Sequence, residues 1–157
     1  MTRKTKDGIV VYNPEDFEKM RRAGKLAAEV LDYITDYVDV GVTTGELDDL
    51  CRKYIESHGA VPACLGYHGY PKSTCISINH VICHGIPDDR KLADGDILNI
   101  DVTVILDGWF GDTSRMYYAG KPKLKATRLC DVTYECMMRG IEVVRPGAVS
   151  YTHLRAH

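Results

Sequence analysis

The chain has 157 residues, of which 45% are apolar and 27% charged, and its formal net charge is −2. This length suffices for one domain with its own core, and the charge balance disfavours a general nucleic-acid binder. No apolar run approaches the roughly 18 residues of a membrane-spanning helix, and the N-terminus lacks the pattern of a secretory signal. The six cysteines show no Cys-x-x-Cys spacing, so we expect free thiols in a reducing cytoplasm rather than disulfides or a zinc finger.

Two amphipathic helices are predicted near the start of the chain. The first opens with Asn13 as N-cap and Pro14 at the first helical position, and its apolar periodicity continues to about Tyr37. Gly24 and Ala27 lie on its apolar stripe and indicate a close approach to another backbone. The second helix begins at Thr43 in a capping box. Both helices are interpreted as scaffold, because neither carries a residue pattern that demands a chemical role.

Residues 60–75 form an unusual loop, in which tyrosines and a histidine stand among glycines and prolines. Such a loop is either a lid packed on the core or the wall of a pocket, and composition favours neither. Cys64 and Cys75 near aromatic rings would make a soft, polarizable pocket that suits a thioether side chain.

Two short strands are predicted next, over residues 75–78 and 81–83, with a turn between them at Asn79-His80. His84 ends the second strand beside a glycine. A lone histidine in that place is either a structural residue or a catalytic one, and its position near the loop of residues 60–75 keeps both interpretations open.

The stretch from residue 96 to residue 118 predicts a β-hairpin, because Asp107-Gly108 separates two runs rich in β-branched and aromatic residues. With this two-residue loop, the two residue numbers of each facing pair add up to 215. Asp101 and Asp112 then become diagonal neighbours on one face, about 7–8 Å apart at the backbone. That polar face either meets water or binds a cation. The lack of lysine and glutamate on it, and the repulsion between two aspartates, favour a shared divalent ion.

A third helix is predicted from about Leu124 to Val144, with an apolar stripe that includes Leu129 and Met137. Residues 149–157 fit neither the helix nor the rest of the chain. They are interpreted as the translation of a transposase end sequence from a sequencing library, with a genuine divergent tail as the alternative.

Three motifs in this order resemble the bacterial type I methionine aminopeptidases, which have the pita-bread metallopeptidase fold. The motifs are Cys64–Ser73, Cys83–Pro87, and Asn99–Thr103 together with Gly111–Ser114. The resemblance covers roughly residues 10–148. It implies an α+β architecture in which residues 1–148 form the N-terminal half of a pita-bread catalytic domain, an antiparallel sheet with helices packed on one face.

The resemblance also implies an activity, the removal of the initiator methionine from nascent chains, and a site. It matches Asp101 and Asp112 to ligands of a dinuclear centre with two divalent ions (Co, Mn, Fe or Zn). It matches His84 to the histidine that contacts the scissile amide and assists the transition state. The pocket for the methionine side chain would contain Cys64, Tyr67, Tyr70 and Cys75, and the backbone at Asn79 and Val81 would hold a monovalent cation.

The remaining ligands of that family, one histidine and two glutamates, lie in a second half that this chain lacks, so the chain is expected to have little or no activity. The implied setting is the cytoplasm, with nascent polypeptide N-termini and the ribosome as partners, no membrane, no specific nucleic acid, and a monomer at full length. One alternative is a non-catalytic pita-bread module that binds peptides or ribosomes. A pita-bread peptidase that cleaves before proline is disfavoured by the Cys64–Ser73 motif.

Overall fold

The computed structural model describes residues 3–149, and its contacts divide the chain between Lys121 and Pro122 into two compact units. Within residues 3–149, none of the helices has the length and apolar character needed to cross a bilayer. Of the suspected tail, only Val149 belongs to this part, so the interpretation of residues 150–157 lies outside the described residues.

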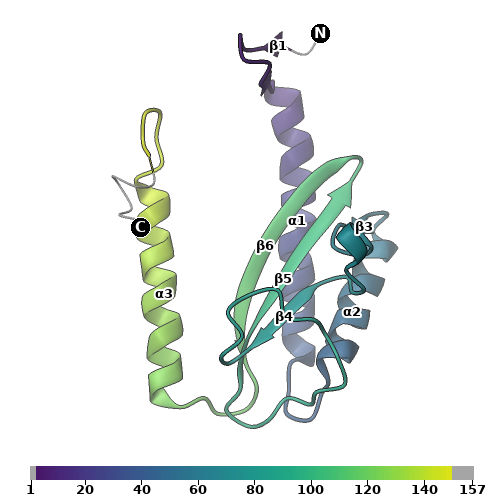
Figure 1. Cartoon of the computed structure of the whole chain (residues 1–157), viewed down its shortest axis with the longest axis vertical. Coiled ribbons are helices and arrows are strands. Elements are labelled where there is room, and N and C mark those ends of the chain that lie inside the picture. The colour runs from purple at the N-terminus through teal and green to yellow at the C-terminus, as the bar shows by residue number, and fades with distance from the viewer. Residues whose placement is uncertain (1–2, 150–157) are drawn as a thin grey trace. The chain divides into compact units, whose positions relative to one another are not determined.

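The first unit contains two α-helices, two 3₁₀ turns and six strands (Figure 1). In chain order these are β1 (Arg3–Lys4), β2 (Val10–Val11), α1 (Pro14–Ile34), η1 (Thr35–Tyr37), α2 (Thr44–Ser57), β3 (Val61–Pro62), η2 (Tyr67–Gly69), β4 (Cys75–Ile78), β5 (Ile97–Leu106) and β6 (Trp109–Tyr118). The predicted helix starts are confirmed, because Asn13 and Thr43 are the N-caps of α1 and α2 and each completes a capping box. The first helix ends at Ile34 and continues as η1 to Tyr37, the predicted end.

The hairpin of β5 and β6 has the predicted register. All ten facing pairs, from Ile97 and Tyr118 to Leu106 and Trp109, have numbers that sum to 215. Asp107 and Gly108 adopt φ angles of 52° and 81°, as a tight turn with both central residues left-handed requires. Strands β3 and β4 pair one after the other along the opposite edge of β5, so β5 lies between β6 on one side and β3 and β4 on the other.

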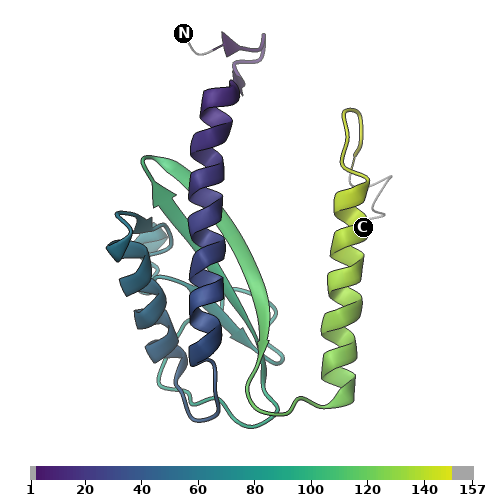
Figure 2. The same cartoon turned by 180° about the vertical axis from the view of Figure 1, so that it is seen from behind.

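Helices α1 and α2 cover one face of this antiparallel sheet, behind it in Figure 1 and in front of it in Figure 2. Alternate residues of β5 point to the helices and are fully buried, whereas Asn99, Asp101 and Thr103 point to the opposite face. The core joins these buried β5 residues to α1 and α2, and it includes Leu98, Ile100, Val102, Val104, Val30, Leu31, Ile34, Leu47, Cys51 and Ile55. The open face of the sheet is therefore left for the site.

Helix α1 and strand β6 approach each other closely, but the glycine that permits the approach is Gly111 on the strand. A Cβ at Gly111 would lie 2.2 Å from the carbonyl oxygen of Ala23 and 2.6 Å from the backbone nitrogen of Gly24. A Cβ at Gly24 itself would meet no atom within 4 Å. The predicted close approach of another backbone at Gly24 is confirmed, and the glycine whose missing Cβ permits it is Gly111.

The strand predicted at residues 81–83 is wrong. Asn79 adopts a left-handed φ of 52°, and the backbone N–H of Val81 donates to the carbonyl of Ile78 and closes a tight turn. Residues 81–83 then leave the sheet, and the side chain of Ile82 is 95% exposed. The chain returns at Gly85, whose carbonyl accepts a hydrogen bond from the Ile76 N–H of β4.

The second unit contains helix α3 (Leu124–Glu142), which ends two residues before the predicted Val144. Its predicted apolar stripe is not buried: Leu129 is 61% exposed and Met137 is 51% exposed. Within this helix, Cys130 is buried.

Candidate active site

A cavity of about 780 Å³ opens on the face of the sheet that the helices leave uncovered. Residues from β4, β5, β6 and the two loops beside them surround it: Ala63, Cys64, Tyr67, His68, Gly69, Tyr70, Pro71, Cys75, His84, Ile86, Asp101, Thr103, Phe110 and Asp112. Seven of the nine predicted site residues are among them. Asn79 and Val81 are not.

Asp101 and Asp112 lie diagonally across the hairpin, since Asp101 faces Ser114 and Asp112 faces Thr103. Burial raises the pKa of the Asp101 carboxyl, and the negative charge of Asp112 raises it further, whereas His84 acts in the opposite direction. A cation between the two carboxylates would relieve this repulsion, and oxygen donors suit hard or borderline divalent ions.

The donor set for a metal is nevertheless partial. Within residues 3–149, no group of three or more histidine, cysteine, aspartate or glutamate side chains is arranged to hold an ion. Two carboxylates supply fewer ligands than a divalent transition metal or a pair of such ions requires. Asp101 and Asp112 therefore fit part of the donor set for a divalent ion, and a complete metal centre would need further donors.

His84 reaches this cavity from a strained backbone. Its φ is 55°, which a residue other than glycine adopts rarely and at a cost. The next residue, Gly85, packs so closely on β4 that a Cβ there would lie 2.1 Å from the Ile76 carbonyl oxygen. Gly85 also donates its N–H to the Ser77 hydroxyl at 3.1 Å. The segment is therefore fixed to β4 immediately after the histidine, which holds the imidazole at the cavity and near Asp101.

The loop of residues 60–75 is a pocket wall. It leaves the edge of β5 after Ala63, whose N–H donates to the Thr103 carbonyl, and it returns at Cys75, which faces Asp101. The loop thus begins and ends beside the aspartate pair, and its side chains line the same cavity.

The pocket wall is soft and uncharged. Burial, followed by the neighbouring Cys75 and Asp101, raises the pKa of the Cys64 thiol to about 11, so this thiol is neutral at physiological pH. Burial and Cys75 also raise the pKa of the Tyr70 phenol. The neutral Cys64 thiol and the aromatic rings that line the cavity match an apolar thioether side chain.

Asn79 and Val81 lie on the turn that follows β4. The Asn79 side chain donates to Asp96 at 2.7 Å and accepts from the N–H of Ile97 at 3.1 Å, so it ties the turn to the start of β5. The predicted cation site at these two residues involves backbone atoms and stays a prediction.

Seven lining residues were not among the predicted site residues: Ala63, His68, Gly69, Pro71, Ile86, Thr103 and Phe110. Thr103 and Phe110 could have been predicted, because each lies two residues from one of the aspartates on its strand and therefore shares the same face of the sheet. His68 has a left-handed φ of 47° and meets the ring of Tyr67 edge-on. Since His68 and Ile86 lie outside the strands, no periodic pattern placed them.

Comparisons with known proteins identify the family of the chain. The model of metallopeptidase family M24 matches residues 18–156. The chain belongs to metallopeptidase family M24. Membership of this metallopeptidase family implies the use of divalent metal ions. The match extends past residue 148, and the boundary expected there stays a prediction.

Similar sequences are methionine aminopeptidases. That of Rickettsia prowazekii is 65% identical over 140 residues, which are 89% of this chain and 54% of the relative. That of Escherichia coli K12 is 62% identical over 142 residues, 88% of this chain and 53% of the relative. The chain therefore spans about half the length of the curated relatives it matches.

Solved structures of the same enzyme class share the fold. The crystal structure of the Rickettsia prowazekii methionine aminopeptidase gives a TM-score of 0.87 over 88% of this chain and 56% of that chain, at 65% identity. The Thermotoga maritima enzyme gives 0.82 over 92% and 56%, at 29% identity. A Bacillus anthracis Xaa-Pro dipeptidase, at 16% identity and a TM-score of 0.76, shares the fold alone. The expected α+β architecture, the N-terminal half of the pita-bread fold, is confirmed.

Proposed function

We propose that this chain forms the N-terminal half of the active site of a metal-dependent aminopeptidase that removes the N-terminal methionine from nascent proteins. The observation that carries the proposal is the single cavity that combines Asp101, Asp112 and His84 with the thiol- and tyrosine-lined loop. The identity of more than 60% to methionine aminopeptidases across most of the chain supports the same substrate class.

Each group has a separate task in this proposal. Asp101 and Asp112 would hold two divalent ions of cobalt, manganese, iron or zinc, together with donors from outside residues 3–149. When bound, these ions supply Lewis-acid activation of the scissile carbonyl and of the attacking water. His84 lies within the cavity beside Asp101, where its ring N–H can donate a hydrogen bond to the scissile amide as charge develops there.

The loop supplies specificity. Cys64, Tyr67, Tyr70 and Cys75 would receive the methionine side chain, and the aspartate pair beside the ends of the loop would place the scissile bond next to the metals. Backbone carbonyls at Asn79 and Val81 would bind a monovalent cation and stabilise the turn behind β4. The proposed substrates are nascent chains, which sets the reaction in the cytoplasm, at or near the ribosome, by a monomeric full-length enzyme.

A non-catalytic peptide- or ribosome-binding module is the alternative. It gives no reason for two repelling carboxylates, one of them with a raised pKa, in the same cavity as a histidine on a strained backbone. A binder would be better stabilised by neutral residues at those positions.

A chimera tests the proposal, because the chain spans half of its relatives. Residues 1–148 would be fused to the part of the Escherichia coli relative that follows its aligned segment. With Mn²⁺ or Co²⁺, the chimera should release methionine from Met-Ala-Ser, and Asp101→Ala or Asp112→Ala should abolish release. The 157-residue chain alone should show little or no turnover, since two carboxylates do not fix two ions.

Two results would contradict the proposal. One is a folded, metal-loaded chimera that binds the peptide without cleaving it, which would favour the binding module. The other is turnover by the 157-residue chain that survives Asp101→Ala, which would place the chemistry at another site.

A further inference from the structure

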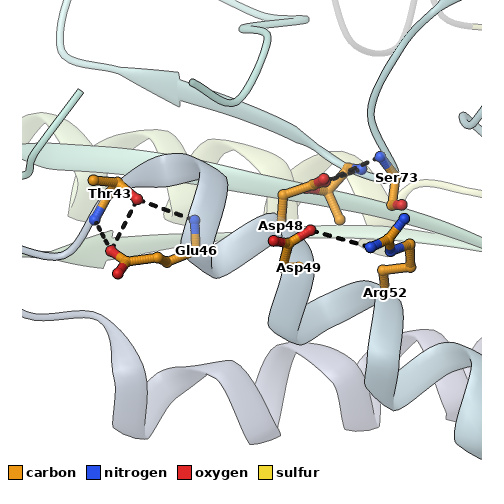
Figure 3. A network of polar contacts seen from close by, with 7 residues as sticks. Thr43, Glu46, Asp48, Asp49, Arg52 and Ser73 are labelled. Carbon is orange, nitrogen blue, oxygen red and sulfur yellow. Dashed lines mark hydrogen bonds and ion pairs between the residues drawn. The ribbon is translucent and has the colours of Figure 1, made fainter. Parts of the chain in front are cut away.

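Asp48 is a buried carboxylate that the site described above does not use. It lies on α2 with 2% exposure, and one carboxylate oxygen accepts three hydrogen bonds. The donors are the Ser73 N–H at 3.0 Å, the Thr74 N–H at 2.8 Å and the Thr74 hydroxyl at 2.7 Å. Figure 3 shows this carboxylate reaching from α2 to the segment that precedes β4.

These hydrogen bonds continue into the cavity. The carbonyl of Thr74 accepts a hydrogen bond from the Tyr70 hydroxyl at 2.9 Å, and the same hydroxyl lies 3.3 Å from the Gly85 carbonyl. Thr74 directly precedes Cys75. The segment that Asp48 holds therefore helps to place two wall residues of the cavity, Tyr70 and Cys75, and Tyr70 in turn contacts the residue after His84.

Asp48 is not needed to attach α2 to the sheet, because other residues do so. Leu47, Cys51 and Ile55 of α2 are fully buried in the core. The N-terminal turn is held separately, because the Thr44 hydroxyl accepts from the Asp88 N–H at 2.9 Å. Burying a carboxylate is costly unless it is well hydrogen-bonded, and an apolar residue would attach the helix without that cost.

We propose that Asp48 is a positioning residue for the methionine pocket: through Ser73 and Thr74 it fixes where Tyr70 and Cys75 stand. This inference rests on the proposed function, since it assigns the pocket to a methionine side chain. Asp48 does not touch the cavity, so it acts through the loop and not on the substrate. Its loss should loosen the pocket wall and leave the core of α2 in place.

Two cysteines, Cys75 in the pocket wall and Cys51 in the core, report on the two regions separately. Cys75 is 8% exposed and belongs to the pocket, whereas Cys51 is fully buried one turn further along α2 and belongs to the core. The test measures alkylation of each thiol by N-ethylmaleimide in the full chain, followed by peptide mass spectrometry. In Asp48→Ala, Cys75 should react at least about tenfold faster, because the hydrogen bonds to a charged acceptor are lost, while Cys51 stays protected.

Conservative and neighbouring variants complete the design. Asp48→Asn keeps one acceptor oxygen without its charge. The alkylation of Cys75 should then be about threefold faster than in the parent chain, which is a partial rescue relative to Asp48→Ala. Asp49→Ala is the matched control. Asp49 is the adjacent, half-exposed aspartate, and its ion pair with Arg52 measures 3.3 Å. Figure 3 shows this pair beside Asp48, and its loss should change the reactivity of neither thiol.

Equal acceleration of Cys51 and Cys75 would overturn the proposal, because Asp48 would then serve general stability. Unchanged Cys75 reactivity in a folded variant would overturn it as well. If Asp48→Ala does not fold by circular dichroism, the same comparison in Asp48→Asn decides. Protection of Cys64 and Cys75 by methioninamide in the parent chain tests the pocket assignment separately: its failure would count against the proposed function and leave the Asp48 result standing.

Discussion

At the scale of single residues, the contact between α1 and β6 depends on one missing Cβ. Gly111→Ala would place a methyl group 2.2 Å from the Ala23 carbonyl, against helix backbone that cannot move aside locally. We expect a loss of about 1–3 kcal/mol in the free energy of unfolding, as for other overpacked cores. Gly24→Ala on the facing helix meets empty space and removes a flexible residue from a helix interior, so it should stabilise the chain by about 0.5–1 kcal/mol. Urea unfolding followed by circular dichroism measures both, and equal effects in the two variants would contradict this account.

The positions of single residues were predictable where a short sequence pattern fixes the backbone geometry. Asp101 and Asp112 could be paired in advance because strand alternation and a two-residue turn leave one register. Asp48 could not be found in the same way. Its partners are 25 and 26 residues away, and on the helix it reads only as the polar neighbour of a buried stripe. The left-handed φ of His84 was not predicted either, because residues other than glycine adopt it rarely.

At the scale of elements, the hairpin turn should be sensitive at one of its two residues. Gly108 has a φ of 81°, so Gly108→Ala should cost about 1 kcal/mol through left-handed strain. Asp107 has a φ of 52°, which asparagine tolerates. Asp107→Asn removes only its exposed ion pair with Arg22 and should cost well under about 1 kcal/mol. Thermal unfolding of the two variants would separate these expectations, and an order reversed between them would contradict the turn assignment.

Tyr117 joins β6 to α1, because its buried hydroxyl donates to the Leu31 carbonyl at 2.6 Å. Burial raises the pKa of this phenol to about 12 from an ordinary value near 10. The folded chain therefore keeps the proton that the unfolded chain releases above pH 10, and the stability contributed by the bond falls as pH rises from 10 towards 12. Tyr117→Phe should cost about 1 kcal/mol at pH 8, and this difference from the parent should shrink at pH 11. A difference that stays constant over that range would show that the hydroxyl does not titrate as described.

Helix boundaries and hairpin register were predictable because capping residues and the Asp-Gly turn are local signals. The segment 81–83 was not predictable, although its residues favour strands. The left-handed Asn79 turns the chain away from the sheet, and the later Gly85 pairs with Ile76 instead. The hydrogen bond between Ile76 and Gly85 therefore outweighed the local strand propensity of residues 81–83, as is common for short segments.

At the scale of the whole molecule, the two units differ in how their apolar residues are used. The hydrophobic core runs from Leu26 to Ala119 and lies wholly within the first unit. In α3 the periodic stripe that predicted a helix is largely exposed, and Leu129 is an example at 61%. The period of a pattern predicts the type of an element and the face it would bury. It does not predict whether a partner for that face is present in the chain.

Helix α3 should accordingly be the least stable helix of the chain. Its N-cap residue, Lys123, makes no side-chain capping bond, and its first turn carries no acidic residue to face the positive end of the helix dipole. A helix of 19 residues without a buried stripe or a cap is marginal in water. Hydrogen exchange should show amides of α3 exchanging at least about 100-fold faster than those of β5. A chain ending at Lys121 should keep the free energy of unfolding of the parent to within about 0.5 kcal/mol, since it retains the entire core. Protection of α3 equal to that of β5, or unfolding of the shortened chain, would show that the exposed stripe is covered in solution and contributes to the stability of the first unit.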